Sequence, residues 1–150
     1  MVVRKDMLHQ QNLLPEALSY AGQAKANSLL NTPPVFVIYV SMLMLRWIKA
    51  KGMGVIEAEN REKAARLYQA IEASEYFTAP VEKASRSLMN VVFRGKDEAT
   101  EKAFLTKCKE ANIEGIEGHR SVGGFRASIY NAVSLEEVDA LVEVINGFGN

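Results

Sequence analysis

Apolar positions recur along this chain with two spacings, one typical of helices and one typical of strands. Residues 34–50 are apolar on almost every face, which predicts a helix buried on all sides. Arg46 interrupts the run before it reaches the roughly twenty apolar residues that a membrane span needs. The Asn-Thr-Pro-Pro of residues 31–34 is a helix start signal, with Thr32 as the predicted cap. On this pattern alone, ordinary capping is favoured over phosphate binding at the helix start.

The second half of the chain alternates between the two spacings. Residues 55–73 predict a helix in which Glu59 with Lys63 and Glu62 with Arg66 are spaced for ion pairs on a solvated face. The further expected elements are a strand over residues 88–94, a helix over 97–111, strands over 113–117 and 125–131, and a helix over 134–147. Two long helices followed by these elements predict an α+β fold in which helices cover a small sheet.

Local cap signals mark the ends of the last two helices. Asp97 is expected to cap the start of the first, and Asn112 suits its end. Ser134 with Glu137 has the spacing of a capping box at the start of the second. These ends depend on residues a few positions apart, so the sequence alone predicts them.

The first thirty residues contain no long periodic run. Residues 1–8 begin with apolar side chains and then turn charged, which predicts the end of a strand. Residues 9–30 are rich in Gln, Asn, Ser and Ala, with Gly22 as a breaker, and predict an irregular connection with at most a short helical turn near residues 16–20. So long a connection is typical of a functional segment, or of one that packs against another domain.

Composition narrows the class of protein. The 150 residues are 48% hydrophobic, enough for one domain with a core, and the formal net charge of zero argues against a nucleic-acid-binding surface. Cys108 is the only cysteine and lies on a helical pattern, which predicts a packed thiol in a reducing compartment. The charged residues after Val3 predict that no signal peptide is present, and no His, Cys or Asp spacing suggests a metal site; His9 stands in a polar loop.

The most distinctive stretch is residues 118–132, in which His119 and Arg120 precede two glycines and a strand-like alternation. Phe125, Ala127 and Ile129 share one face of that strand, so Arg126 points to the other face. Paired glycines allow a tight turn, so the imidazole and the two guanidinium groups can converge on an anion with two acidic ends. From the residues alone, a solvated turn before an ordinary strand remains an equal alternative.

This stretch closely resembles the GHR-x-x-GG-x-RASIYNA segment of the phosphoserine aminotransferases, fold-type-I enzymes that depend on pyridoxal phosphate. Residues 3–8, 31–34 and 86–91 and the closing amphipathic helix resemble that family in the same order. Leu88 and Val92 depart from its usual Arg and Pro, and Phe125 from its usual Met. The resemblance covers only the C-terminal part of such an enzyme, and implies its small domain over residues 34–150 after a remnant of the large domain over residues 1–33.

The resemblance also implies roles for particular residues. Asn31 and Thr32 would contact the phosphate of a cofactor bound mainly by the other subunit of a homodimer. Arg126 would bind the α-carboxylate of the substrate. His119 and Arg120 would reach across the dimer interface to the distal phosphate or carboxylate in the partner's site.

The function implied is amino transfer between glutamate (with 2-oxoglutarate) and 3-phosphohydroxypyruvate (with O-phosphoserine), in cytoplasmic serine biosynthesis, with no membrane, metal or nucleic-acid partner. The family places its Schiff-base lysine before Val2, and Lys5 lies in the charged segment that follows it, so the chain contains no catalytic lysine and is expected to be inactive alone. The alternative is a non-catalytic module that binds a phospho-acid or pairs with a full-length subunit.

Overall fold

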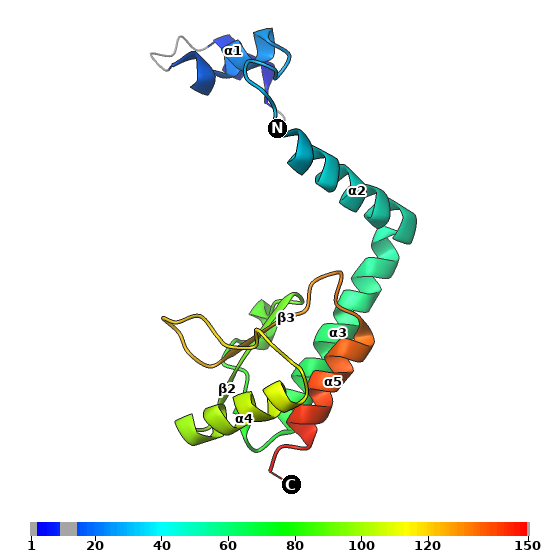
Figure 1. The fold of residues 1–150 in the computed structure, drawn as a ribbon, viewed down its shortest axis with the longest axis vertical. Helices are drawn as coiled ribbons and strands as arrows, with labels where there is room; N and C mark the ends of the chain where they lie inside the picture. The colour runs from blue at the N-terminus through cyan, green and yellow to red at the C-terminus, as the bar shows by residue number, and fades with distance from the viewer. Residues whose placement is uncertain (1–2, 10–14, 150) are drawn as a thin grey trace. The chain divides into compact units, whose positions relative to one another are not determined.

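The computed structural model describes residues 3–9 and 15–149 and divides the chain into two units, Met1–Trp47 and Ile48–Asn150. The first unit holds η1 (Lys5–His9), η2 (Glu16–Leu18), α1 (Tyr20–Lys25) and most of α2 (Val35–Lys51). The second holds α3 (Met53–Ala73), β1 (Phe77–Thr78), η3 (Lys83–Ser85), β2 (Asn90–Gly95), α4 (Glu98–Glu110), β3 (Phe125–Ser128) and α5 (Leu135–Asn146) (Figure 1). The predicted α+β fold is confirmed.

The start of the chain differs from the predicted strand. Residues 1 and 2 lie outside the described residues, and Lys5–His9 forms the 3₁₀ helix η1. The Met7 amide closes its first turn by donating to the Arg4 carbonyl at 3.1 Å, and the Arg4 guanidinium pairs with Asp6 at 2.7 Å. The backbone of this segment is therefore hydrogen-bonded within a local turn, and not to a neighbouring strand as predicted.

The predicted irregular connection contains a helix that the sequence pattern did not reveal. Residues 10–14 of it lie outside the described residues, whereas Glu16–Leu18 forms the expected short turn. Tyr20–Lys25 then forms α1, capped by the Ser19 hydroxyl, which accepts a hydrogen bond from the Gly22 amide at 3.3 Å. A Cβ at Gly22 would lie 3.0 Å from a carbonyl oxygen of η2, so this glycine permits close packing and does not break the helix.

α2 confirms the helix predicted over residues 34–50 to within one residue at each end. Thr32 is not its cap. The first helical hydrogen bond runs from the Ile38 amide to the Pro34 carbonyl at 3.1 Å, which puts Pro34 at the cap position. Thr32 therefore stands two residues before the cap, with its side chain exposed.

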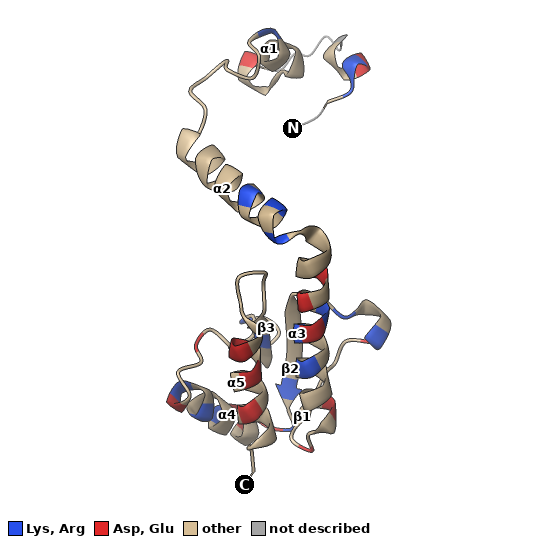
Figure 2. Ribbon diagram, turned by 90° about the vertical axis from the view of Figure 1, so that its right-hand side faces the viewer, with Lys and Arg blue, Asp and Glu red and all other residues tan. Residues whose placement is uncertain are grey.

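The sequence pattern predicts that α2 is buried where cover is supplied from outside this chain, and within the chain most of its side chains are exposed. None of its residues is buried, and Phe36 is 78% exposed. Figure 2 shows basic residues only toward its C-terminal end, so its earlier turns present an apolar surface. An all-round apolar helix is buried only when other elements cover every face, and the described residues leave α2 uncovered. Within those residues, no helix combines the length and the apolar character needed to cross a bilayer.

The three strands form an antiparallel sheet in the order β1-β2-β3. Val92 pairs with Arg126, and Phe93 pairs with Phe125. Phe93 and Phe125 are buried on the side of the helices, whereas Arg126 is exposed, so one face of the sheet is covered and the other is open. In Figures 1 and 2, α3 and α5 lie side by side. The predicted faces of β3 are confirmed.

Aromatic rings fill the centre of this core. Phe125 lies with its ring centroid 4.9 Å from those of Phe93 and Phe104, and Phe77 lies 4.6 Å from Phe104. Most pairs of rings meet edge to face, the arrangement that their charge distribution favours. Phe125, where the family usually has Met, therefore packs fully, at 1% exposure.

The predicted caps of α4 and α5 are present. The Asp97 carboxylate accepts from the Thr100 amide at 2.7 Å, and Ser134 with Glu137 forms both bonds of the capping box. At the end of α4, Asn112 takes a positive φ of 56°, and the Ile113 amide donates to the Cys108 carbonyl at 2.8 Å. This is the left-handed ending that asparagine tolerates better than most residues.

Lys63 is not on the solvated face where the sequence pattern put it. It is 2% exposed, and its ammonium donates to the carbonyls of Ile129, Tyr130 and Val133 at 3.3, 2.8 and 2.9 Å. Burial lowers the pKa of Lys63. The predicted pair of Glu62 with Arg66 does form, at 2.8 Å, whereas Glu59 pairs with Lys51 at 2.5 Å.

A second polar contact joins the same two parts of the chain. The buried Asn60 amide of α3 donates to the Asn131 side-chain oxygen at 2.8 Å. Lys63 and Asn60 lie one turn apart on α3, so both reach the connection between β3 and α5. α3 therefore fixes the end of the strand that carries Arg126.

Candidate functional site

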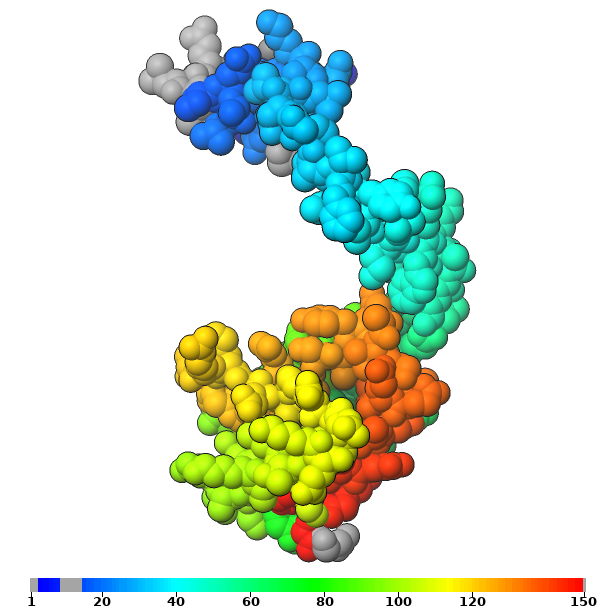
Figure 3. Space-filling view, in the orientation of Figure 1, coloured from blue at the N-terminus to red at the C-terminus, as the bar shows by residue number. Residues whose placement is uncertain are grey.

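His119 and Arg120 lie in a closed loop, residues 118–124, directly before β3. The Gly118 amide donates to the Gly124 carbonyl at 2.9 Å and closes the base of the loop. The predicted strand over residues 113–117 is reduced to one isolated bridge, of Glu117 with Phe125. Figures 1 and 3 show this loop, in yellow to amber, standing out from the rest of the second unit.

Two glycines make this closure possible. A Cβ at Gly118 would lie 2.2 Å from the Gly123 carbonyl oxygen, a distance that no side chain tolerates. Gly124 has a φ of +66°, in the left-handed region that favours glycine. The tight turn that the paired glycines predicted is confirmed.

The His119 ring is oriented by Ser121. The Ser121 amide donates to His119 Nδ1 at 3.2 Å, and the Ser121 hydroxyl lies 2.7 Å from the same atom. A backbone amide can only donate, so Nδ1 is the acceptor and the proton of the neutral ring is on Nε2. The exposed Nε2–H is then a donor that an anion can accept from.

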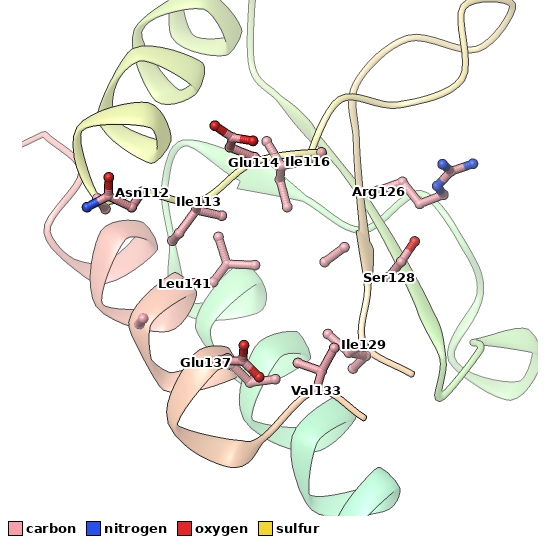
Figure 4. A pocket seen from close by; sticks show the side chains of 15 residues that line it. Asn112, Ile113, Glu114, Ile116, Arg126, Ser128, Ile129, Val133, Glu137 and Leu141 are labelled. Carbon is pink, nitrogen blue, oxygen red and sulfur yellow. The ribbon is translucent and has the colours of Figure 1, made fainter. Parts of the chain in front are cut away.

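Arg126 projects from the open face of the sheet. Figure 4 shows its guanidinium directed away from a cavity of about 420 Å³ that Ile113, Ile129 and Leu141 face. That cavity lies on the helix side of β3, so it is not part of the anion site. The backbone amide of Arg126 donates to the Ile116 carbonyl at 2.8 Å, beside the base of the loop that carries His119 and Arg120.

Polar side chains share the open face of the sheet with Arg126. Asn90, opposite Ser128 in the neighbouring strand, accepts from the Ser128 hydroxyl at 3.0 Å and from the Tyr130 hydroxyl at 3.2 Å. None of these three residues was predicted as a site residue from the sequence. Strand alternation could have identified Ser128 and Tyr130, because residues 126, 128 and 130 share a face in an extended strand.

Arg94 is a further residue beside the loop that was not predicted from the sequence. It lies two residues after Val92 on β2, and its Nη2 donates to the Val122 carbonyl at 2.7 Å. Arg94, Arg120 and Arg126 are all positively charged and exposed. No sequence spacing marks Arg94 as a contact of residue 122.

Asn31 and Thr32 lie in the first unit and are exposed ahead of α2. Their amide and hydroxyl groups can donate to phosphate oxygens, and the adjacent start of α2 carries a partial positive charge. Pro33 and Pro34 have no N–H to contribute, and the Val35 amide is bonded to the Pro33 carbonyl at 2.8 Å. This donor set fits part of a phosphate group, with the side chains of Asn31 and Thr32 as its contributors.

Cys108 is a packed side chain, as the sequence predicts. It is fully buried, and burial raises the pKa of its thiol to about 11. A thiol in this state is not a nucleophile near neutral pH.

Comparisons with known proteins identify a family and several similar enzymes. Residues 10–141 match the family model described as aminotransferase class-V. The chain is 45% identical over 150 residues to the phosphoserine aminotransferase of Listeria monocytogenes, with 99% of this chain and 41% of that protein covered. It is 48% identical to that of Geobacillus kaustophilus, with 98% and 42% covered.

Solved structures agree with the sequence matches. A phosphoserine aminotransferase from Bacillus circulans subsp. alkalophilus matches with a TM-score of 0.84 and 44% identity, over 90% of this chain and 38% of that one. A PLP-bound phosphoserine aminotransferase from Trichomonas vaginalis matches with a TM-score of 0.83 and 38% identity, over 95% and 42%. The chain thus spans about two-fifths of the length of the relatives it matches.

Proposed function

The chain belongs to the aminotransferase class-V family, and from this premise we propose that it supplies the substrate-binding part of a phosphoserine aminotransferase. The reaction is amino transfer between glutamate and 3-phosphohydroxypyruvate, a step of serine biosynthesis in the cytoplasm. Support comes from the relatives that match along nearly the whole chain. Residues 34–150 correspond to the small domain of that enzyme, and residues 1–33 belong to its large domain.

One observation carries the substrate assignment: hydrogen-bond donors that suit an anion occupy two separate places beside the same strand. Arg126 stands on the open face of β3, and His119 with Arg120 stands in the loop before it. Both substrates carry an α-carboxylate at one end and a second anion at the other. By resemblance to the phosphoserine aminotransferases we assign the α-carboxylate to Arg126, whose guanidinium can bind a carboxylate with two parallel hydrogen bonds.

His119 and Arg120 bind the distal group, and in a homodimer they serve the partner subunit's site. The Nε2–H of His119 and the guanidinium of Arg120 are donors that both a phosphate and a carboxylate accept. A phosphate carries close to two negative charges, so it gains more from these donors than a carboxylate does. This pair therefore sets the preference for phosphoserine over glutamate.

Asn31 and Thr32 would help to hold the phosphate of pyridoxal phosphate, again in a site shared between subunits. When bound, this cofactor supplies the electron sink that amino transfer requires. Lys63 is not available for covalent chemistry, because its buried ammonium is bonded to three backbone carbonyls. We assign no catalytic lysine to this chain.

The test is a chimera in which this chain replaces the matching segment of the Geobacillus kaustophilus relative. We expect the chimera to transaminate 3-phosphohydroxypyruvate with glutamate, and the 150-residue chain alone to show no turnover. In the chimera, Arg126→Ala should lower kcat/KM about ten- to a hundredfold for both substrates. Arg61→Ala is the matched control, since Arg61 is an exposed arginine that pairs only with Glu57 in the described contacts.

Two results would refute the proposal. One is a folded chimera that binds the cofactor and yet has no turnover. The other is an Arg126→Ala variant with the kinetics of Arg61→Ala. Turnover by the 150-residue chain alone would refute the claim that the catalytic lysine lies outside it. Binding of phosphoserine by an inactive chimera would favour the alternative, a non-catalytic module that binds a phospho-acid.

A further inference from the structure

Arg94 connects β2 to the loop of residues 118–124. Its Nη2 donates to the Val122 carbonyl at 2.7 Å, across 28 residues of sequence. The other described backbone bonds of this loop join residues within it or at its base. Arg94 is thus the one side chain from another strand with a described hydrogen bond to the loop.

A second contact joins Arg94 to the end of the same loop. A Cβ built on Gly124 would lie 2.8 Å from Arg94 Cγ and 2.8 Å from the Phe93 carbonyl oxygen. The aliphatic part of Arg94 therefore packs closely against the Gly124 backbone, while its guanidinium reaches Val122. These two contacts hold both the middle and the end of the loop.

The residue that Arg94 holds is bonded directly to His119. The amides of Val122 and Gly123 both donate to the His119 carbonyl at 2.9 Å. Ser121, which orients the His119 ring, is the residue before Val122. A displacement of the Val122 carbonyl would therefore move the backbone of His119 and the group that fixes its ring.

We propose that Arg94 is a positioning residue, which holds the loop in the shape that places His119 and Arg120 for the distal anion of the substrate. This proposal rests on the function proposed above for these two residues. Arg94 acts on the anion through the loop, because its guanidinium donates to a backbone carbonyl. An ordered loop binds an anion more tightly than a mobile one, since less conformational freedom is lost on binding.

Arginine suits this task better than lysine. A guanidinium presents several N–H groups in a rigid plane, so it can bond to a carbonyl while its stem stays against Gly124. A lysine keeps the charge and part of the stem but has a single flexible ammonium. We therefore expect Arg94→Lys to recover part of what Arg94→Gln loses.

The first experiment measures amide hydrogen exchange in the 150-residue chain and in the chimera. Arg94→Gln should speed exchange of the Val122 and Gly123 amides about tenfold, because their bonds to His119 open more often. The Arg126 amide, bonded to Ile116 at the base of the loop, should not change. Arg61→Gln is the control, and Arg94→Lys should lie between it and Arg94→Gln.

The second experiment measures kinetics in the chimera. Arg94→Gln should raise KM for phosphoserine about tenfold and KM for glutamate less, with kcat little changed, because it loosens the groups that prefer a phosphate. A loss of stability alone would lower the active fraction without changing the ratio of the two KM values. Arg120→Ala should change that ratio in the same direction and further.

These outcomes separate the two proposals. If Arg120→Ala leaves the ratio unchanged, the proposed role of the loop fails, while hydrogen exchange still reports whether Arg94 orders it. If Arg120→Ala changes the ratio and Arg94→Gln matches Arg61→Gln in both experiments, the positioning role is overturned. A change in the ratio without faster exchange would also overturn it, because Arg94 would then contact the anion itself.

Discussion

Phe36 in α2 and Phe93 in β2 carry the same apolar side chain, yet the first is 78% exposed and the second is fully buried. Around Phe93, positions inside and outside the core alternate along β2, so a single face needs cover, and α3 and α4 pack against the strand. Around Phe36, every face of the helix is apolar, and the described residues cover none of them. An apolar run thus predicts that a segment tends to be buried, but the cover must come from another element.

The largest expected effect contrasts these two phenylalanines. Phe93→Ala should destabilise the second unit by about 3–5 kcal/mol, because it opens a cavity among packed aromatic rings. Phe36→Ala removes an exposed ring and should change the free energy of unfolding by less than about 0.5 kcal/mol. Urea unfolding followed by circular dichroism measures both, and equal effects would contradict the difference in burial.

Cys108 provides a chemical measure of burial in the second unit. Its pKa, raised by burial to about 11, leaves very little thiolate near neutral pH, and the side chain is fully enclosed. At about pH 8 an aromatic disulfide reagent should react at least about a hundredfold more slowly with the folded chain than with the chain in urea. Fast reaction without denaturant would mean that the second unit opens readily.

Lys63 tests whether a buried polar contact stabilises the same unit. Lys63→Met leaves the carbonyls of Ile129, Tyr130 and Val133 without their donor, and should cost about 1–3 kcal/mol. Lys102→Met is the control, because Lys102 makes an exposed pair with Glu98 at 2.7 Å and should cost less than about 0.5 kcal/mol. Equal costs would mean that the three carbonyls are satisfied without Lys63.

The same variant has a pH signature. The pKa of Lys63 is lower in the folded chain than in the unfolded one, so between these two values the unfolded chain binds more protons. Stability contributed by this residue therefore rises with pH across that window. Subtracting the Lys63→Met profile from the parent profile isolates the rise, since the other titrating groups are common to both; a falling difference would contradict the burial.

α2 should show the smallest effect on stability and a clear effect on association. Its exposed apolar surface predicts self-association of the chain, or binding of a hydrophobic dye, at micromolar concentration. Phe36→Lys with Leu45→Lys should reduce both without altering the unfolding of the second unit. Sedimentation and dye fluorescence measure this, and a parent chain that stays monomeric and binds no dye would show that α2 is covered in solution.

Local signals in the sequence predicted a large part of the fold. Asp97 and Ser134 cap helices through amides three residues away, so the bounds of α4 and α5 could be predicted from short stretches. The three acceptors of Lys63 lie 66 to 70 residues along the chain, and no local pattern reports such a contact. For that reason the buried position of Lys63 was missed.

In the candidate site, too, features set by nearby residues were predicted and features set by distant contacts were not. The side of β3 on which Arg126 lies followed from strand alternation, and the tight loop followed from its glycines. The contact of Arg94 with Val122 depends on the pairing of β2 with β3, and the sequence did not reveal the order of the strands. The cap of α2 was mistaken because two successive prolines allow more than one start to the helix.

The most direct test of the account is the ratio of kcat/KM for phosphoserine to kcat/KM for glutamate in the chimera. Arg126→Ala should lower both values by a similar factor, roughly ten- to a hundredfold, because both substrates lose the same α-carboxylate contact. Arg120→Ala should lower the value for phosphoserine about tenfold more than that for glutamate, because the phosphate carries the larger charge. A ratio that changes for Arg126→Ala and stays constant for Arg120→Ala would contradict the assignment of the two ends of the substrate.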